Sequence, residues 1–261
     1  MGDIAPLPVL IERAAEHVAL VTLNRPAARN AINAELAERL SEILKVTEND
    51  DDVRAVILTG SGAAAFCSGA DLKEVDAGRM ASLFRDNGFA GFVDAPRRKP
   101  WIAAVNGFAL AGGCEIALAC DLIVAANNAV FGLPEVQRGL IAAAGGAYRL
   151  SRKIPPAIAA ELILTGRMMP AIEALNRGLI NRVTNAGGLI EEALQLAGQI
   201  AANAPLAVSA SLELLRASPD LDDSDLGTKS RSMLKALSLT QDYAEGPRAF
   251  LERRLPVWKG C

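Results

Sequence analysis

Short apolar runs that alternate with segments of helical periodicity constrain the fold of the first half of this chain. Residues 9–13, 17–24, 53–60, 101–106 and 121–126 have the length and apolar content of strands. Residues 34–49 repeat their apolar side chains at helical spacing, and helices are also expected near 71–86 and from Gly112 onward. Because such alternation is typical of strands joined by crossover helices, we expect a layered α/β fold.

The second half, from about residue 155, is mainly helical in pattern. Gly and Pro separate its helical segments, and only residues 179–184 have the pattern of a strand. We therefore expect an α/β core domain over residues 1–190, which contains the functional site, and a helical region over 191–261. Terminal helices of this kind often serve assembly, so an oligomer is expected.

Composition and charge argue against several classes of protein. The chain has 261 residues, of which 51% are apolar, so a large core is expected. Its net charge is −3 without a dense basic stripe, which argues against a nucleic-acid partner. The apolar stretches are interrupted before 18 residues, and the N-terminus lacks a basic start followed by an apolar run. Neither a membrane span nor a secretory signal is expected.

Cysteine and histidine usage limit the chemistry. Cys67, Cys114, Cys120 and Cys261 show no CxxC spacing, so we expect neither a metal nor a disulfide framework, and reduced thiols fit a cytoplasmic enzyme. His17 is the single histidine, at a predicted strand end. Since Ser-His-Asp and Cys-His mechanisms need a positioned imidazole, acid–base chemistry must come from carboxylates, Lys, Tyr or Cys unless His17 supplies it.

Two glycine-containing stretches have the pattern of backbone anion sites. In "NGFALAGGCEIALACD" (106–121), Gly112 and Gly113 precede a segment of helical spacing, so Gly112 is expected at a helix N-terminus with free N–H groups. In "SGAAAFCSGADLKEV" (61–75), Gly62 and Gly69 bracket a loop that runs into a helix, with Asp71 near its start. Gly-rich turns before helices are also common without any function.

Two acids accompany these stretches. Glu115 falls in the first turn of the helix that begins at Gly112, and Glu135 lies in a turn bounded by Pro and Gly. Two carboxylates beside an oxyanion site can divide general acid and general base work. The alternatives are that Glu115 only complements the helix dipole and that Glu135 is a solvated turn residue.

Several separated motifs, in order, resemble the crotonase superfamily of enoyl-CoA hydratases and isomerases. They are "LNRPAARNAI" (23–32), "AFCSGADLKEV" (65–75), "AAVNGFALAGGCEIALACD" (103–121) and "FGLPEVQRGLI" (131–141). The segments "PPAIAAELILTGRMM", "GLINRV" and "AEGPRAFLERRLPVWKG" most resemble the carnitinyl-CoA dehydratase (crotonobetainyl-CoA hydratase) branch. The resemblance implies a crotonase-like spiral of repeated ββα units followed by a C-terminal helical trimerisation region.

The resemblance also implies a reaction and its residues. The chain is expected to be an acyl-CoA hydratase/dehydratase that adds or removes water across the 2,3 double bond through an enolate. The backbone N–H groups of Ala70 and Gly112 would hold the thioester oxygen. Glu115 would mainly activate water and Glu135 would protonate Cα. No cofactor is implied, because coenzyme A belongs to the substrate.

The remaining residues carried over from the family concern substrate binding and assembly. The expected CoA contacts are Arg25, Ala70, Asp71, Leu72 and Lys73, together with Phe250 and Arg253, often from a neighbouring subunit. Phe84, Trp101 and Ala143 are expected to line the acyl pocket, with core packing as the alternative for the two aromatic rings. Homotrimers or dimers of trimers are the usual assembly.

Some features depart from the family pattern or leave alternatives open. Ala27 stands where many relatives have a Lys that contacts a phosphate of CoA, and Arg29 is the candidate to replace that contact. Ala142-Ala143-Ala144 stands where the family has a Pro-Gly-Ala turn. A carnitinyl group is cationic and needs aromatic rings or a carboxylate, whereas only 4% of residues are aromatic. A Δ3,Δ2-enoyl-CoA isomerase and a non-catalytic CoA-binding protein are the alternative functions.

Overall fold

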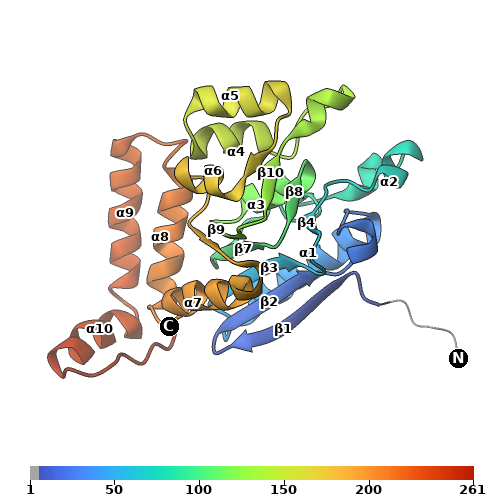
Figure 1. Cartoon of the computed structure of the whole chain (residues 1–261). Coiled ribbons are helices and arrows are strands. Elements are labelled where there is room, and N and C mark those ends of the chain that lie inside the picture. Colours follow the sequence, from blue (N-terminus) through green and yellow to red (C-terminus); the bar gives the residue numbers. More distant parts are fainter. Residues whose placement is uncertain (1–5) are drawn as a thin grey trace, which may run out of the picture.

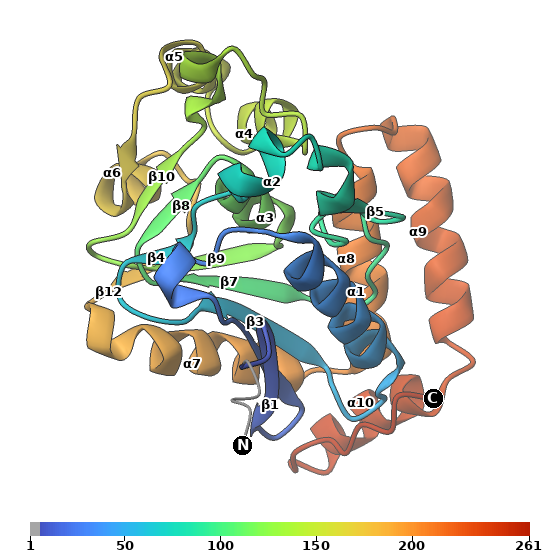
Figure 2. The ribbon, with the colours of Figure 1, turned by 90° about the vertical axis from the view of Figure 1, so that its right-hand side faces the viewer.

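A six-stranded sheet forms the base of the molecule in the computed structural model, which describes residues 6–261 (Figures 1 and 2). The expectation that the N-terminus has no secretory signal concerns residues 1–5 in part, and these lie outside the described residues. The strand order is β1-β2-β3-β7-β9-β12, and only the β1–β2 pair is antiparallel. The strands are β1 (Val9–Ala15), β2 (Val18–Leu23), β3 (Ala55–Gly60), β7 (Trp101–Val105), β9 (Leu122–Ala126) and β12 (Arg182–Thr184).

Alternate residues of this sheet enter two different cores. Val21 and Leu58 point into the main core, which also contains α1 (Ala34–Asn49), whereas Leu20 and Ile57 pack against α7 (Leu189–Ala201) on the opposite face. Both faces are therefore covered, as expected for central parallel strands with nearly continuous apolar sequences. The side-chain period of two assigns each residue to its face.

A second, smaller sheet stands beside the first and carries the glycine-rich segment. Its order is β11-β10-β8-β4, with only β10–β11 antiparallel. Helix α3 (Gly112–Ala119) follows β8 directly, and every one of its residues is buried. The strands are β4 (Ala65–Cys67), β8 (Phe108–Leu110), β10 (Val130–Gly132) and β11 (Met169–Pro170), and a separate hairpin consists of β5 (Phe84–Arg85) and β6 (Gly88–Phe89).

The α/β fold is confirmed, but the helix expected near 71–86 is wrong. Helix α2 ends after five residues (Leu72–Asp76), and Gly78 then adopts a φ of +69°. The chain continues through the 3₁₀ turn η2 (Met80–Leu83) into the β5–β6 hairpin. A left-handed glycine ends a helix readily because it carries no Cβ.

Three C-terminal helices stand apart from the sheets (Figure 1). The predicted domain division at 190/191 falls inside α7, whose apolar side packs on the large sheet. The helices that leave the sheet are α8 (Pro205–Ala217), α9 (Asp223–Leu237) and α10 (Gln241–Leu251). The remaining elements are α4 (Gly146–Lys153), α5 (Pro156–Thr165), α6 (Ala171–Asn176) and the 3₁₀ turns η1 (Pro26–Ala28), η3 (Pro134–Arg138) and η4 (Ala186–Gly188).

Candidate active site

Helix α3 begins at Gly112, where the sequence places a free helix N-terminus. The preceding Ala111 has φ 49° and ψ −128°, a conformation that costs a residue with a Cβ about 1–3 kcal/mol. Its N–H donates to the Gly132 carbonyl at 2.9 Å, which fixes the turn. Within residues 6–261, the Gly112 N–H donates no hydrogen bond, so it remains available to a ligand.

The loop that carries Ala70 lies directly against this helix start. A Cβ built on Gly69 would lie 3.1 Å from the Gly112 nitrogen, and Gly69 has a φ of +96°. The Ile32 N–H donates to Gly69 O, and the Asp71 N–H donates to Ile32 O, each at 2.8 Å. Ala70 lies between them, and its N–H has no acceptor in the described part of the chain. Two unused N–H groups therefore lie on touching loops.

Glu115 is buried one turn into α3, with only 4% of its surface exposed. Its Oε1 accepts a hydrogen bond from the Gly146 N–H at 2.8 Å. Burial raises the pKa of the Glu115 carboxyl from 4.5 to about 7, the Gly146 bond opposes this shift, and the negative charge of Glu135 adds to it. Glu115 therefore keeps its proton to a higher pH than an ordinary carboxyl does.

Glu135 lies in η3, half-buried and directly after Pro134. Its Oε2 is buried, and no hydrogen-bond partner for it lies among residues 6–261. Burial raises the pKa of this carboxyl above its usual value, and the positive charge of Arg138 partly opposes the shift. Because Glu135 also raises the pKa of Glu115, the two carboxyls form an interacting pair.

Arg25 holds the Ala70 loop from within the protein. Both of its terminal nitrogens lie 3.0 Å from Oδ2 of Asp71, and Nη1 also donates to the Ala31 carbonyl. Asp71 caps α2 by accepting from the Lys73 N–H. Of the residues predicted to contact CoA, Leu72 and Lys73 are exposed, and Asp71 already has two partners.

The residues predicted for the acyl pocket have different environments. Phe84 is 37% exposed and meets Phe89 edge to face, with ring centroids 5.5 Å apart. Ala143 is exposed in the turn before α4. Trp101 has no exposed surface and packs against Phe92, so its ring belongs to the core, as the alternative interpretation had it. The ring of Phe89 lies against Gly112 instead, where an added Cβ would lie 2.5 Å from the ring.

Two further predicted CoA contacts lie far from these groups. Phe250, which is 83% exposed, and Arg253 lie at the end of α10 and just after it, at the opposite end of the molecule from α2 (Figure 1). One chain alone does not bring them to the Ala70 loop.

His17 is in the turn between β1 and β2, where its Nδ1 lies 2.9 Å from the Asp52 carbonyl oxygen.

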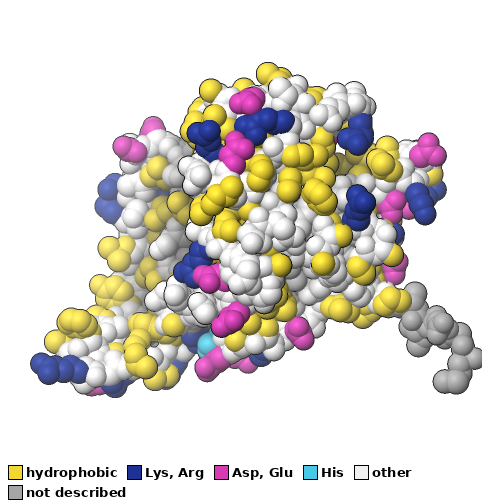
Figure 3. Space-filling view, in the orientation of Figure 1, with side chains coloured by type: hydrophobic (Ala, Val, Ile, Leu, Met, Phe, Trp, Pro, Cys, Tyr) yellow, Lys and Arg dark blue, Asp and Glu magenta, His cyan; other side chains and the backbone are white. Residues whose placement is uncertain are grey.

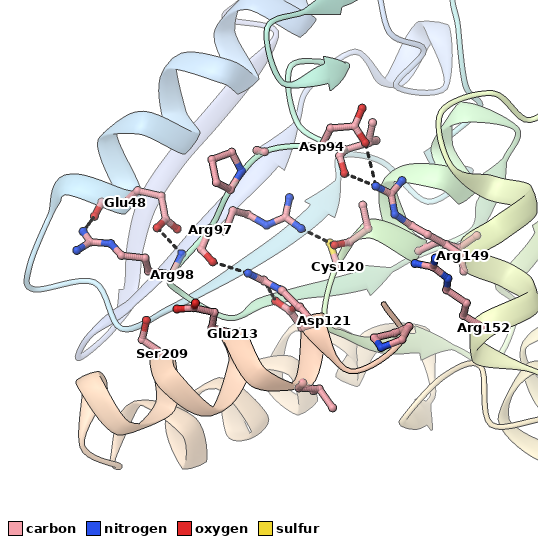
Figure 4. A pocket seen from close by; sticks show the side chains of 18 of the residues that line it. Glu48, Asp94, Arg97, Arg98, Cys120, Asp121, Arg149, Arg152, Ser209 and Glu213 are labelled. Carbon is pink, nitrogen blue, oxygen red and sulfur yellow. Dashed lines mark hydrogen bonds and ion pairs between the residues drawn. The ribbon is translucent and has the colours of Figure 1, made fainter. Parts of the chain in front are cut away.

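A large groove elsewhere in the described structure does not contain the two acids. It has a volume of about 1040 Å³ and lies between α8 and the core, with Arg97, Asp121, Arg149 and Arg216 in its wall (Figure 4). Asp121 accepts three hydrogen bonds from Arg216, at 2.7, 2.8 and 2.9 Å. The chemistry favours the site at Gly112 over this groove, because the two interacting acids with raised pKa values lie at Gly112.

The sequence assigns no role to Gly146, whereas Phe89 belongs to the aromatic cluster that the family resemblance places at the acyl pocket. Gly146 contacts Glu115 across 31 positions, and no local pattern reports a contact of that range. The paired Gly145-Gly146 before a helix was the available signal for Gly146. For Phe89, the signal was the cluster of aromatic residues between positions 84 and 101.

Taken together, the site has two free N–H donors on adjoining loops and two interacting acids with raised pKa values. Such donors stabilise negative charge on a carbonyl oxygen, and such acids exchange protons near neutral pH. The arrangement is therefore suited to reactions through an enolate.

The chain is similar to known proteins over nearly its whole length. The sequence profile of the family described as enoyl-CoA hydratase/isomerase matches residues 13–261. The carnitinyl-CoA dehydratase of Proteus mirabilis is 43% identical over 92% of this chain and 94% of its own. A crystal structure of an enoyl-CoA hydratase from Mycobacterium tuberculosis H37Rv is 41% identical, with a TM-score of 0.94 over 98% of this chain and all of that one. A carnitinyl-CoA hydratase from Mycobacterium avium is 44% identical, with a TM-score of 0.77 over the same shares. The chain belongs to the enoyl-CoA hydratase/isomerase family, as the sequence motifs predict.

Proposed function

We propose that this protein is an acyl-CoA hydratase/dehydratase, a carbon–oxygen lyase that acts on 2-enoyl-CoA thioesters. The observation that carries the proposal is the pair of free N–H groups, on Ala70 and Gly112, beside the interacting acids Glu115 and Glu135. Relatives named carnitinyl-CoA dehydratase and structures named enoyl-CoA hydratase support it.

In the proposed reaction, the thioester oxygen accepts hydrogen bonds from the Ala70 and Gly112 N–H groups. Glu115, as the carboxylate, removes a proton from water, and the water oxygen bonds to Cβ. The electron pair of the double bond moves toward the thioester oxygen to form an enolate, which the two N–H groups stabilise. Glu135 then delivers a proton to Cα, and the thioester carbonyl forms again. Dehydration follows the same steps in reverse.

The raised pKa values suit a pair of carboxyls that shares one proton, whereas the division of roles between them rests on the family resemblance. Because burial disfavours ionisation of both carboxyls and the negative charge of Glu135 disfavours ionisation of Glu115, the pair can hold one proton and one negative charge near neutral pH. One acid is then ready to accept a proton while the other is ready to give one.

The substrate enters as a complete CoA thioester, and the proposal includes no further cofactor. The loop from Ala70 to Lys73, in which Leu72 and Lys73 are exposed, is the proposed contact for the CoA nucleotide. Phe250 and Arg253 are proposed to reach the CoA of a neighbouring subunit in a homotrimer or a dimer of trimers. No helix within residues 6–261 is long and apolar enough to cross a membrane. The cytoplasmic location stays a prediction.

The test is a panel of 2-enoyl-CoA thioesters of varied chain length, with loss of the absorbance of the conjugated thioester as the readout. We expect turnover of crotonyl-CoA or a substituted relative. CoA binding without turnover of any member would reject the proposal and favour a non-catalytic CoA-binding protein. Turnover of a 3-enoyl-CoA to its 2-enoyl isomer, without hydration, would favour the isomerase.

Carnitinyl-CoA is the finer candidate, supported by the 43% identity to enzymes of that name. The opposing physical point is that a trimethylammonium group needs aromatic faces or a carboxylate. Phe89 places its ring against Gly112, Phe84 meets Phe89 edge to face, and Asp94 already pairs with Arg149. A higher kcat/KM for crotonobetainyl-CoA than for crotonyl-CoA would support carnitine chemistry, and the reverse would reject it.

A further inference from the structure

Arg149 joins two parts of the site that are far apart in the sequence. It lies in α4, one turn after Gly146, and its side chain is 19% exposed. Its Nη1 donates at 2.7 Å to the carbonyl of Ala144, a residue of the turn that ends with Gly146. Its Nη2 donates to the Val93 carbonyl at 2.7 Å and to Oδ1 of Asp94 at 3.0 Å. Figure 4 shows Arg149 directed from α4 toward Asp94.

One end of this connection reaches Glu115. The Gly146 N–H donates to Glu115, and the preceding Gly145 has a φ of +103°. A Cβ built on Gly145 would lie 1.9 Å from Nη1 of Arg149, so the guanidinium occupies the space where a side chain would be. The turn that orients Glu115 therefore packs directly on Arg149.

The other end reaches the Gly112 donor. Asp94 packs against the β5–β6 hairpin, since a Cβ built on Gly88 would lie 2.1 Å from Oδ2 of Asp94. The next residue of that hairpin, Phe89, places its ring against Gly112. Contacts therefore run from Glu115 through the Gly146 turn to Arg149, and from Arg149 through Asp94 and the hairpin to Gly112, which is on the same helix as Glu115.

We propose that Arg149 is a positioning residue of the hydration reaction, which fixes Glu115 relative to the Gly112 donor and keeps a positive charge beside it. The proposal rests on the proposed function. The charged groups that face Glu115 are Glu135 from η3 and Arg149 from α4, and the thiol of Cys114 lies on its own helix. Arg149 lowers the pKa of Glu115, whereas Glu135 raises it.

The test compares Arg149→Met, Arg149→Lys and the matched control Arg152→Met. Arg152 is on the same helix, and its partner Asp220 is exposed, so the control removes an equal charge away from the turn. Two quantities are measured. One is the pH dependence of kcat/KM. The other is the pH at which the protonated Glu115 carboxyl band disappears from the infrared spectrum of unliganded protein, assigned by its absence in Glu115→Gln.

For Arg149→Met, we expect the infrared midpoint and the acidic limb of kcat/KM to rise by about 0.5 pH units or more, because a positive charge is lost near the carboxyl. We expect kcat to fall about 10- to 100-fold with a small change in KM, because the acid is misplaced. Arg149→Lys should restore the midpoint but not the full kcat. Arg152→Met should resemble the wild-type chain.

Equal effects of Arg149→Met and Arg152→Met on both quantities would overturn the proposal. If Arg149→Met does not fold, Arg149→Lys decides, since a kcat equal to that of the wild-type chain would reject the positioning role and a lower one would support it. The infrared midpoint does not depend on turnover. A wild-type chain inactive on every enoyl-CoA, with a midpoint that still moves in Arg149→Met, would therefore reject the hydratase function alone.

Discussion

Glu135 is half-buried, and its Oε2 is buried without a partner in the described structure. A carboxyl that stabilises the fold would have its oxygens paired. For Glu135→Gln we expect kcat to fall by about 10²–10⁴-fold with a smaller change in KM, because proton transfer is lost while the shape is kept. The measurement is steady-state hydration of crotonyl-CoA. Glu191→Gln, an exposed site on α7, is the control, and a Glu135→Gln enzyme within fivefold of the wild-type kcat would remove Glu135 from the reaction.

The burial of Glu115 predicts a cost in stability. Its pKa is about 7 in the folded chain and near 4.5 in the unfolded chain, so between these values the folded state keeps a proton that the unfolded state has lost. Stability from this group is therefore lost as the pH rises from about 4.5 through 7. Glu115→Gln cannot ionise, so we expect it to raise the free energy of unfolding by about 1–3 kcal/mol at pH 8 and by less at pH 5. Denaturant unfolding at both pH values tests this, and a gain that is equal at both would contradict it.

At the scale of single residues, the sequence predicts much of the candidate site. Gly112 is too poor a helix former, and Glu115 too polar a core residue, for their places to be explained by packing alone. What the sequence does not predict is the partner of each group. The bond from Gly146 spans 31 positions and the Arg25–Asp71 pair spans 46. Both depend on how the elements meet, which no local pattern encodes.

At the scale of elements, the contact between α3 and α4 decides how Glu115 is held. A Cβ on Gly146 would lie 3.0 Å from Cγ of Glu115 and 2.8 Å from a methyl carbon of Leu133, so the turn must move. For Gly146→Ala we expect kcat to fall at least about tenfold, from misplacement of the acid, and stability to fall by about 1–3 kcal/mol, from overpacking.

The control for this prediction is Gly198→Ala. Gly198 is exposed inside α7, and a Cβ there meets nothing within 4 Å. This variant should gain about 0.5–1 kcal/mol, because alanine is the better helix former, and keep its activity. Hydration kinetics and thermal unfolding of both variants are the measurements. A fully active Gly146→Ala enzyme would show that the turn does not position Glu115.

The predicted helix near 71–86 shows what limits prediction of elements. Apolar residues at helical spacing are present there, but Gly78 interrupts the helix, and Phe84 and Phe89 meet each other in a hairpin beside Gly112. Tertiary contacts override local preference here. The strands of the large sheet were predicted correctly because their apolar runs are short and clearly bounded.

At the scale of the whole molecule, the C-terminal helices leave apolar side chains in solvent. Figure 3 shows hydrophobic side chains along α9 and α10 at the lower left of the molecule. Phe250 and Leu251 at the end of α10, Leu239 between the two helices and Leu255 after α10 are each at least 80% exposed. So many large apolar side chains together are typical of an interaction surface. This is the physical support for the assembly that the family resemblance implies.

We expect the wild-type chain to sediment at three or six times its 27.4 kDa mass. A charge at position 250 opposes burial of this surface, so Phe250→Asp should shift the mass toward that of one chain. Its activity should fall as well, because Phe250 and Arg253 would no longer reach the CoA of a neighbour. Leu164→Asp is the control, since Leu164 is 74% exposed on α5, away from the C-terminal helices. Analytical ultracentrifugation and kcat/KM are measured on the same samples. A wild-type enzyme that is active as a single chain, or a dissociated Phe250→Asp with full activity, would show that the site is complete within one chain.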